Sequence, residues 1–125
     1  MILGLGIDFL ETRRVAQELA RGEWLQDDGI FTAEEIGRCS SAGEPARSYT
    51  ECFAAKEAAL KALGLPVRDL AMFREAEVGL VDDRGYELIL HDRLKAESEK
   101  LGVRRIRLAF AGDARQAGAI VILEN

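Results

Sequence analysis

The sequence predicts an α+β fold in which a mostly antiparallel sheet packs against one long central helix. An apolar segment with two glycines opens the chain, an alanine-rich segment fills its middle, and short alternating segments fill its second half. Short alternating segments joined by tight turns favour antiparallel strands. A chain of 125 residues can bury one ordinary core, so we expect a single domain over residues 1–125.

The first strand and the first helix follow from residue type and spacing. Residues 2–9 are rich in β-branched and large apolar side chains, which favours a strand. Val15 and Leu19 are four residues apart, the spacing of one helix face, so we expect a short helix over 12–20. Gly22 is suited to end that helix.

Two more helices follow in the first half of the chain. Thr32 and Glu35 have the spacing of a capping box, which marks a helix start. The glycines and serines of residues 37–43 favour an early end to this helix. The longest helix is expected over 44–63, because its apolar residues have helical spacing and Gly64 follows it.

The second half of the chain alternates between strand and helix signals. Turn residues separate the two members of each expected strand pair, and a glycine follows the expected helix. We expect strands over 76–81, 86–90, 105–110 and 119–123, and a charged helix over 92–101.

Composition excludes several classes of function. Lys and Arg total 17 against 22 Asp and Glu, and no basic block occurs, so a general nucleic-acid footprint is not expected. Asp8 interrupts the first apolar run, which is too short for a signal peptide or a membrane span. Cys39 and Cys52 match no metal or redox spacing. We therefore expect reduced thiols in or near the core of a cytoplasmic protein.

Three residues in two segments are chemically informative. Asp8 stands at the end of the first strand, and Glu57 and Lys61 lie within the longest helix. Glu57 and Lys61 are four residues apart and could simply form an ion pair worth about 0.2–0.5 kcal/mol. Asp8 alone could be a strand-end or capping carboxylate. Spacing by itself therefore favours a structural interpretation of all three.

Three motifs occur together in this chain: Gly-Ile-Asp near its start, Phe-Thr-x-x-Glu from residue 31, and Phe-Ala-Ala-Lys-Glu-Ala-x-x-Lys-Ala-Leu-Gly over 53–64. In order and distance they resemble the holo-(acyl carrier protein) synthases of the 4'-phosphopantetheinyl transferase family. The third motif is highly specific, and the resemblance extends over essentially the whole chain. It implies a 4'-phosphopantetheinyl transferase-like fold.

This resemblance implies transfer of 4'-phosphopantetheine from coenzyme A to a serine of an acyl (or peptidyl) carrier protein, with release of 3',5'-ADP. Asp8, Glu57 and Lys61 would be the catalytic residues, and Asp8 and Glu57 would also bind Mg²⁺, or Mn²⁺, with the diphosphate. Lys61 and Lys56 would contact coenzyme A. Two carboxylates about 4 Å apart repel by roughly 4 kcal/mol at an effective dielectric constant near 20, and a hard cation relieves that repulsion.

The resemblance also implies protein partners. Arg14 and Arg21 match basic positions that hold the acidic recognition helix of an acyl carrier protein or related carrier domain. Family members are usually homotrimers in which neighbouring subunits share each active site. The carrier could serve fatty acid, polyketide or peptide synthesis, and neither a membrane nor a nucleic acid is expected as a partner.

Three positions depart from the family pattern. Cys52 replaces an arginine that contacts coenzyme A, and Ala109 and Gly112 replace members of a Ser-x-x-His motif that faces the nucleotide. Losing one such donor typically lowers the rate about 10²–10³-fold, although Asp113 or Arg115 could substitute for a missing group. A second hypothesis is a degenerate homologue that binds a carrier protein or acyl-pantetheine, or catalyses another reaction in the same cleft. A third is a trimeric structural protein without a ligand.

Overall fold

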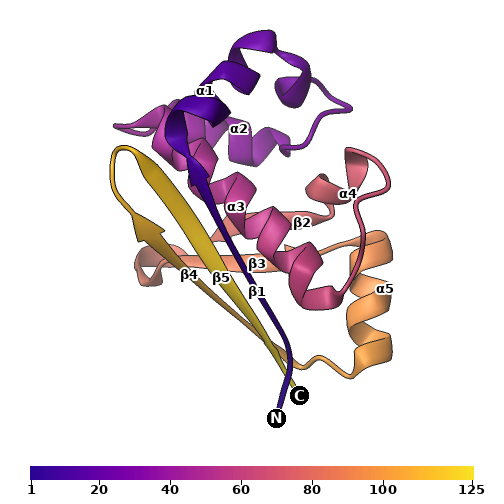
Figure 1. The fold of residues 1–125 in the computed structure, drawn as a ribbon. Helices are drawn as coiled ribbons and strands as arrows, with labels where there is room; N and C mark the ends of the chain where they lie inside the picture. The colour runs from indigo at the N-terminus through magenta and orange to yellow at the C-terminus, as the bar shows by residue number, and fades with distance from the viewer.

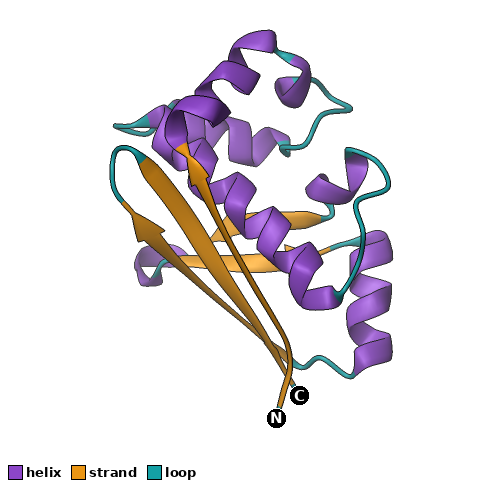
Figure 2. Cartoon of the chain, in the orientation of Figure 1, coloured by secondary structure: helices purple, strands orange, loops and turns teal.

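A three-stranded antiparallel sheet lies against one long helix in the computed structural model, which describes residues 1–125 (Figure 1, Figure 2). The strand order is β1-β5-β4, and β2 pairs with β3 in a separate antiparallel sheet. The predicted α+β fold with a mostly antiparallel sheet and a long central helix is confirmed. The elements are β1 (Ile2–Glu11), α1 (Thr12–Arg21), η1 (Glu23–Leu25), α2 (Ala33–Ser40), α3 (Pro45–Leu63), α4 (Ala71–Arg74), β2 (Ala76–Leu80), η2 (Asp82–Arg84), β3 (Tyr86–Leu90), α5 (Asp92–Leu101), β4 (Arg105–Gly112) and β5 (Gln116–Glu124).

The core lies around α3, which packs on β1 and β5 and is buried along most of its length. Small side chains such as Ala54, Ala55, Ala58 and Ala59 allow this contact on several faces of the helix. α3 is the longest helix, yet neither it nor any other helix is long and apolar enough to cross a membrane.

Two glycines bring β1 very close to α3. A Cβ built on Gly6 would lie 1.8 Å from the carbonyl oxygen of Ala58, and one on Gly4 would lie 2.2 Å from that of Ala62. Both separations are far shorter than van der Waals contact, so any side chain would push the strand away from the helix. Because alternate strand residues share a face, Asp8 points to the same side of β1 as Gly6 and faces α3.

Gly6→Ala should therefore destabilise the protein. We expect the free energy of unfolding, measured by urea denaturation, to fall by roughly 1–3 kcal/mol or more because of overpacking. The matched control is Gly37→Ala in α2, where a new Cβ meets no atom within 4 Å. The control should be neutral or stabilised by about 0.5–1 kcal/mol, because alanine restricts the unfolded chain more than glycine does. Equal losses in both variants would contradict this explanation.

Most predicted boundaries are confirmed within one to three residues. Gly22 and Gly64 end α1 and α3 in the left-handed conformation, with φ of 83° and 70°. The capping box of Thr32 and Glu35 is present. The expected early end of α2 within residues 37–43 is confirmed, because the helix ends at Ser40, although Gly37 itself does not end it. The short elements η1 and α4 were not predicted, since neither is long enough to show helical periodicity.

Candidate active site

Asp8 from β1 meets Glu57 and Lys61 from α3. Glu57 and Lys61 share one helix face because they are four residues apart, and the tight packing at Gly6 brings Asp8 to that face. The ammonium of Lys61 donates to Asp8 Oδ1 at 3.0 Å and to the carbonyl oxygen of Ile7 at 3.2 Å. The structure thus brings the three predicted catalytic residues together.

The carboxyl group of Asp8 lies near that of Glu57 and affects its pKa. Burial, a hydrogen bond with Asp8 and the charge of Asp8 raise the pKa of Glu57 to about 7, and Lys61 opposes this rise. Asp8 Oδ2 is buried and has no hydrogen-bond partner. When Glu57 is ionised, the two carboxylates carry one negative charge more than Lys61 can balance. A divalent cation can supply the missing positive charge.

Glu57→Gln should change the pH dependence of stability. A carboxyl group whose pKa rises on folding binds more protons in the folded state, so stability falls as pH rises from 4.5 to about 7. Glutamine is neutral at every pH and avoids this loss. We expect the variant to melt roughly 3–5 °C higher than wild type at pH 8, in the presence of a chelator, and at nearly the same temperature at pH 5.

This shift corresponds to only about 1 kcal/mol, because water screens the partly exposed Glu57. Glu77→Gln is a control of the same chemistry, since His91 donates to that carboxylate and its pKa is lowered, not raised. A melting-temperature difference that is equal at pH 5 and pH 8 for Glu57→Gln would contradict the raised pKa.

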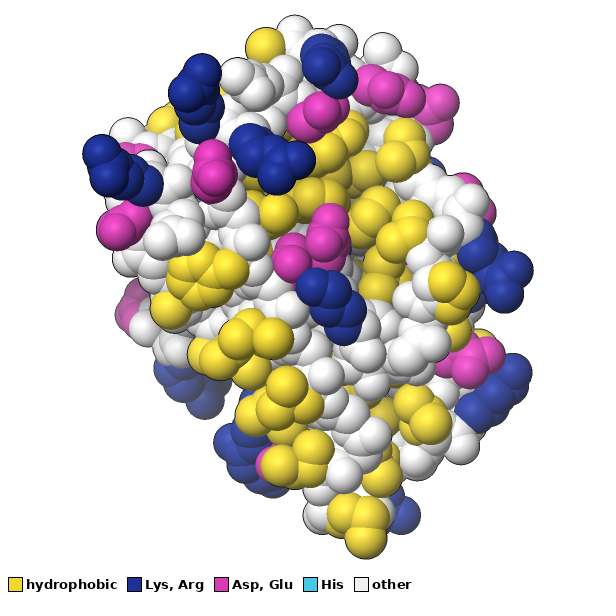
Figure 3. Space-filling view, in the orientation of Figure 1, with side chains coloured by type: hydrophobic (Ala, Val, Ile, Leu, Met, Phe, Trp, Pro, Cys, Tyr) yellow, Lys and Arg dark blue, Asp and Glu magenta, His cyan; other side chains and the backbone are white.

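A cavity of about 430 Å³ opens beside Glu57 and carries one of the two predicted carrier-binding arginines. Arg14 lines this cavity, whereas Arg21 is exposed at the far end of α1 and pairs with Glu18 at 3.2 Å. In Figure 3, acidic and basic side chains adjoin a hollow lined by hydrophobic side chains. The cavity is lined by Leu10, Arg14, Val15, Gln17, Glu18, Trp24, Phe53 and Glu57.

The apolar wall of this cavity was not predicted as part of the site. Trp24 and Phe53 contribute to it, and their rings pack 4.6 Å apart. In the sequence, Phe53 only marks the apolar face of a helix, and Trp24 stands in a segment without periodicity. Its only signal is an isolated large aromatic residue within a polar stretch.

Lys56 does not join the site, which corrects the expectation that it contacts coenzyme A. Its side chain is 0% exposed and forms an ion pair with Glu35 at 2.8 Å. It also donates to the carbonyl oxygens of Phe73 and Ala76, both at 2.9 Å. All three ammonium hydrogens are therefore used inside the core. A single residue step turns a helix by about 100°, so Lys56 and Glu57 point in different directions.

The three replaced positions divide between the core and the surface of the sheet. Cys52 is 2% exposed, and its thiol donates to Glu35 Oε2 at 3.3 Å. Burial is the main cause that raises the pKa of this thiol, which keeps it protonated and able to donate. Ala109 and Gly112 are exposed on β4. As expected, both cysteines are free and buried.

Comparison with known proteins gives consistent matches. Residues 4–117 match the family described as the 4'-phosphopantetheinyl transferase superfamily. A holo-[acyl-carrier-protein] synthase of Geobacter sp. (strain M21) is 39% identical over 126 residues that cover 100% of both chains. The crystal structure of a holo-[acyl-carrier-protein] synthase from Neisseria meningitidis has a TM-score of 0.84 and 30% identity, covering 100% of both chains. A holo-(acyl-carrier-protein) synthase from Bacillus anthracis str. Ames, in complex with CoA (3',5'-ADP), has a TM-score of 0.75 and 28% identity over 98% of this chain and 96% of that one.

Proposed function

The chain belongs to the 4'-phosphopantetheinyl transferase superfamily, and from this premise we propose that it transfers 4'-phosphopantetheine from coenzyme A to a serine of an acyl carrier protein. The observation that carries the proposal is the meeting of Asp8, Glu57 and Lys61 beside an open cavity. A coenzyme A complex of a similar synthase supports coenzyme A as the donor.

The reaction exchanges one phosphorus–oxygen bond for another. The serine hydroxyl of the carrier attacks the β-phosphorus of coenzyme A, and the bond from that phosphorus to the bridging oxygen breaks. 3',5'-ADP leaves with the bonding electron pair, and a carboxylate of the Asp8–Glu57 pair takes up the serine proton. A group that accepts a proton works best when its pKa is near the working pH, as that of Glu57 is.

Lys61 is suited to hold the diphosphate of coenzyme A. An ammonium group has three hydrogens, and Lys61 uses two of them on Ile7 and Asp8. Its side chain is 54% exposed, so the third can reach a phosphate oxygen. Charge-assisted bonds of this kind are the stronger class of hydrogen bond and can stabilise the charge that develops on the leaving group.

The residues present fit a divalent cation such as Mg²⁺. The unpartnered Asp8 Oδ2 and the raised pKa of Glu57 mark two carboxylates that share only the one positive charge of Lys61. Mg²⁺ typically uses one or two carboxylates together with waters and substrate phosphates, so Asp8 and Glu57 suffice as protein ligands. When bound, the cation would neutralise charge on the diphosphate.

The carrier protein is proposed to cover α1 and the cavity beside Glu57. Arg14 lines that cavity and Arg21 lies further along the same helix, so both can face an acidic helix of the carrier. Complementary charge of this kind speeds and orients docking. The carrier serine would then enter the cavity next to Asp8 and Glu57.

We also propose that the chain assembles as a homotrimer through the outer face of the three-stranded sheet. Figure 3 shows a band of hydrophobic side chains on this side of the molecule. Its exposed members include Ile2, Leu5, Ile7, Phe9 and Ile120. Exposed apolar patches commonly mark protein interfaces, and sedimentation at a single chain mass would overturn this assembly.

Mass spectrometry tests the proposed reaction directly. A panel of apo carrier proteins is incubated with coenzyme A, Mg²⁺ and the protein, and the expected result is a mass gain of one phosphopantetheine on the carrier. Glu57→Gln should slow this gain strongly. A carrier that binds without gaining mass would instead support a homologue that has lost transferase activity.

A further inference from the structure

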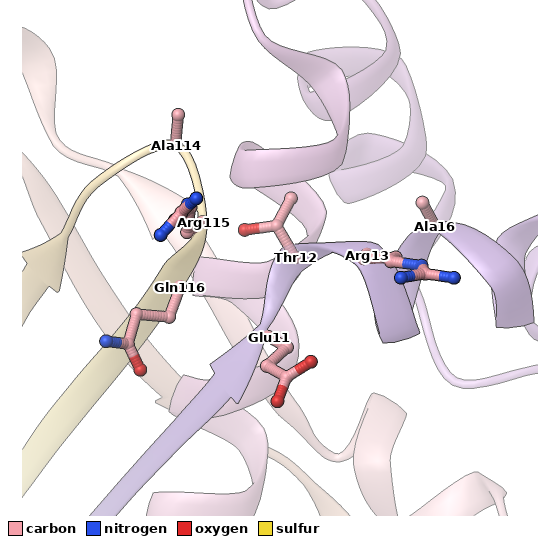
Figure 4. Close-up of a pocket in the computed structure, with 7 residues that line it drawn as sticks. All are labelled: Glu11, Thr12, Arg13, Ala16, Ala114, Arg115 and Gln116. Carbon is pink, nitrogen blue, oxygen red and sulfur yellow. The ribbon is translucent and has the colours of Figure 1, made fainter.

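The largest cavity of the molecule lies on the opposite flank of α1 from Arg14. It has a volume of about 590 Å³ and opens between the start of α1 and the turn that joins β4 to β5 (Figure 4). Thr12 and Arg13 line it from the helix, Arg115 lines it from the turn, and Gln116 lines it from the start of β5. We call this space the turn cavity.

The start of α1 is arranged unusually for a helix. Its N-cap residue, Glu11, makes no side-chain capping bond, and no acidic residue occurs in the first turn. Arg13 and Arg14 occupy that turn instead. The free amides at a helix start carry partial positive charge, so two arginines there add like charge. An anion at this end would relieve that repulsion.

Thr12 provides a second, independent sign of a missing ligand. Thr12 is 9% exposed, and its buried Oγ1 has no hydrogen-bond partner. The backbone amide of Thr12 is already used by the carbonyl oxygen of Arg115 at 2.9 Å. A buried unpaired hydroxyl costs roughly 1–3 kcal/mol. Figure 4 shows this hydroxyl directed toward the turn that carries Arg115, across the cavity.

The charge of the turn cavity favours an anion. Arg13 and Arg115 stand on its two walls, and Glu11 is the only acidic residue in its lining. Figure 4 shows the Glu11 carboxylate directed away from Thr12. Asp113 lies just outside and accepts the backbone amides of Arg115 and Gln116 at 2.8 and 3.0 Å, which fixes the shape of the turn.

We propose that the turn cavity binds an acidic side chain of the carrier protein, between the Thr12 hydroxyl and the Arg115 guanidinium. This inference rests on the proposed function and extends the carrier-docking surface from α1 onto the β4–β5 turn. Continuity supports it: Arg13 and Arg14 are neighbours on α1 and line cavities on its two flanks. A carrier that covers α1 would therefore reach both.

Steady-state transfer kinetics test the proposal with two variants and a matched control. Arg115→Glu should raise KM for the carrier about ten- to hundredfold, since a charged hydrogen bond is lost and a like charge is introduced. Thr12→Val, which keeps the shape of the side chain, should raise it about two- to tenfold without lowering the melting temperature. KM for coenzyme A should not change in either. Arg84→Glu, at an exposed site in η2, should alter neither constant.

Several outcomes would overturn the proposal. The first is a KM for the carrier in Arg115→Glu that stays within twofold of the value in Arg84→Glu. The second is a rise in KM for coenzyme A alone, which would assign the cavity to the nucleotide. Inorganic sulfate, compared with chloride at equal ionic strength, should compete with the carrier in wild type more than in Arg115→Glu. Sulfate binding without any effect of Arg115→Glu on the carrier would reveal a site for free anions.

Failure of the proposed function would look different. In that case wild type would transfer nothing to any carrier, whichever residue occupies position 115. Calorimetric titration of wild type and Arg115→Glu with the apo carrier would still decide the role of the turn cavity. Weaker binding by the variant supports the proposal, and equal binding contradicts it.

Discussion

Asp8→Asn is expected to lower kcat/KM for transfer about 10²–10³-fold while the fold remains intact. Asparagine keeps the shape of the side chain but removes the charge that pairs with Lys61 and, together with Glu57, would hold a cation. Transfer should be followed by mass spectrometry of the carrier at several concentrations of coenzyme A. The loss should appear mainly in kcat, because these groups act on charge that develops during the reaction.

The stability of Asp8→Asn separates this explanation from simple unfolding. The substitution removes a negative charge beside Glu57, so the pKa of Glu57 should move back toward its ordinary value. The melting temperature at pH 8 should therefore stay level or rise. Asp83→Asn, at an exposed position in η2, is the control and should leave transfer unchanged. A variant with full transfer activity would refute the catalytic role of Asp8.

Lys56→Met is expected to cost about 3–5 kcal/mol of folding free energy. Its ammonium is the charge partner of Glu35, and both side chains are 0% exposed. Methionine fills similar space but leaves the Glu35 carboxylate buried without a counter-charge. It also leaves the carbonyl oxygens of Phe73 and Ala76 without their donor. Urea denaturation with a two-state analysis measures the loss.

Lys61→Met is the matched control for stability, since it lies on the same helix but its side chain is 54% exposed. Its ion pair with Asp8, whose side chain is 11% exposed, is only partly buried and should contribute less than the fully buried pair of Lys56 and Glu35. Adding Glu35→Gln to Lys56→Met should recover part of the loss, because the unpaired charge is then removed. A Lys56→Met variant as stable as the Lys61→Met control would show that the buried pair is not required.

Local signals in the sequence were enough to predict most of the fold. The Thr32–Glu35 capping box and the glycines after α1 and α3 act within a few residues, so their physics can be read from spacing. The glycines and serines of residues 37–43 also marked the end of α2. Gly37 itself stays within the helix, because a glycine costs only about 1 kcal/mol there and burial of Cys39 offsets that cost.

The candidate site was less accessible to such reasoning. The contact of Asp8 with Lys61 joins residues far apart in the chain, and only the family resemblance indicated that the two belong to one site. Lys56 was misplaced because a lysine normally stays in water. In addition, α3 is packed on several faces, so the spacing of its apolar residues does not show which faces are buried. The turn cavity depends on Thr12 and Arg115, which adjoin only after β1 and β5 have paired.

The Glu35 carboxylate makes three separate segments behave as one. Oε1 accepts from the backbone of Thr32 and from Lys56, and Oε2 accepts from Cys52 and the backbone of Val78. The start of α2, the middle of α3 and strand β2 are therefore anchored to a single group that water does not reach. A fluctuation that loosens one of these segments removes a partner from the buried Glu35 charge, which all three segments share. We therefore expect the three segments to open together and only rarely.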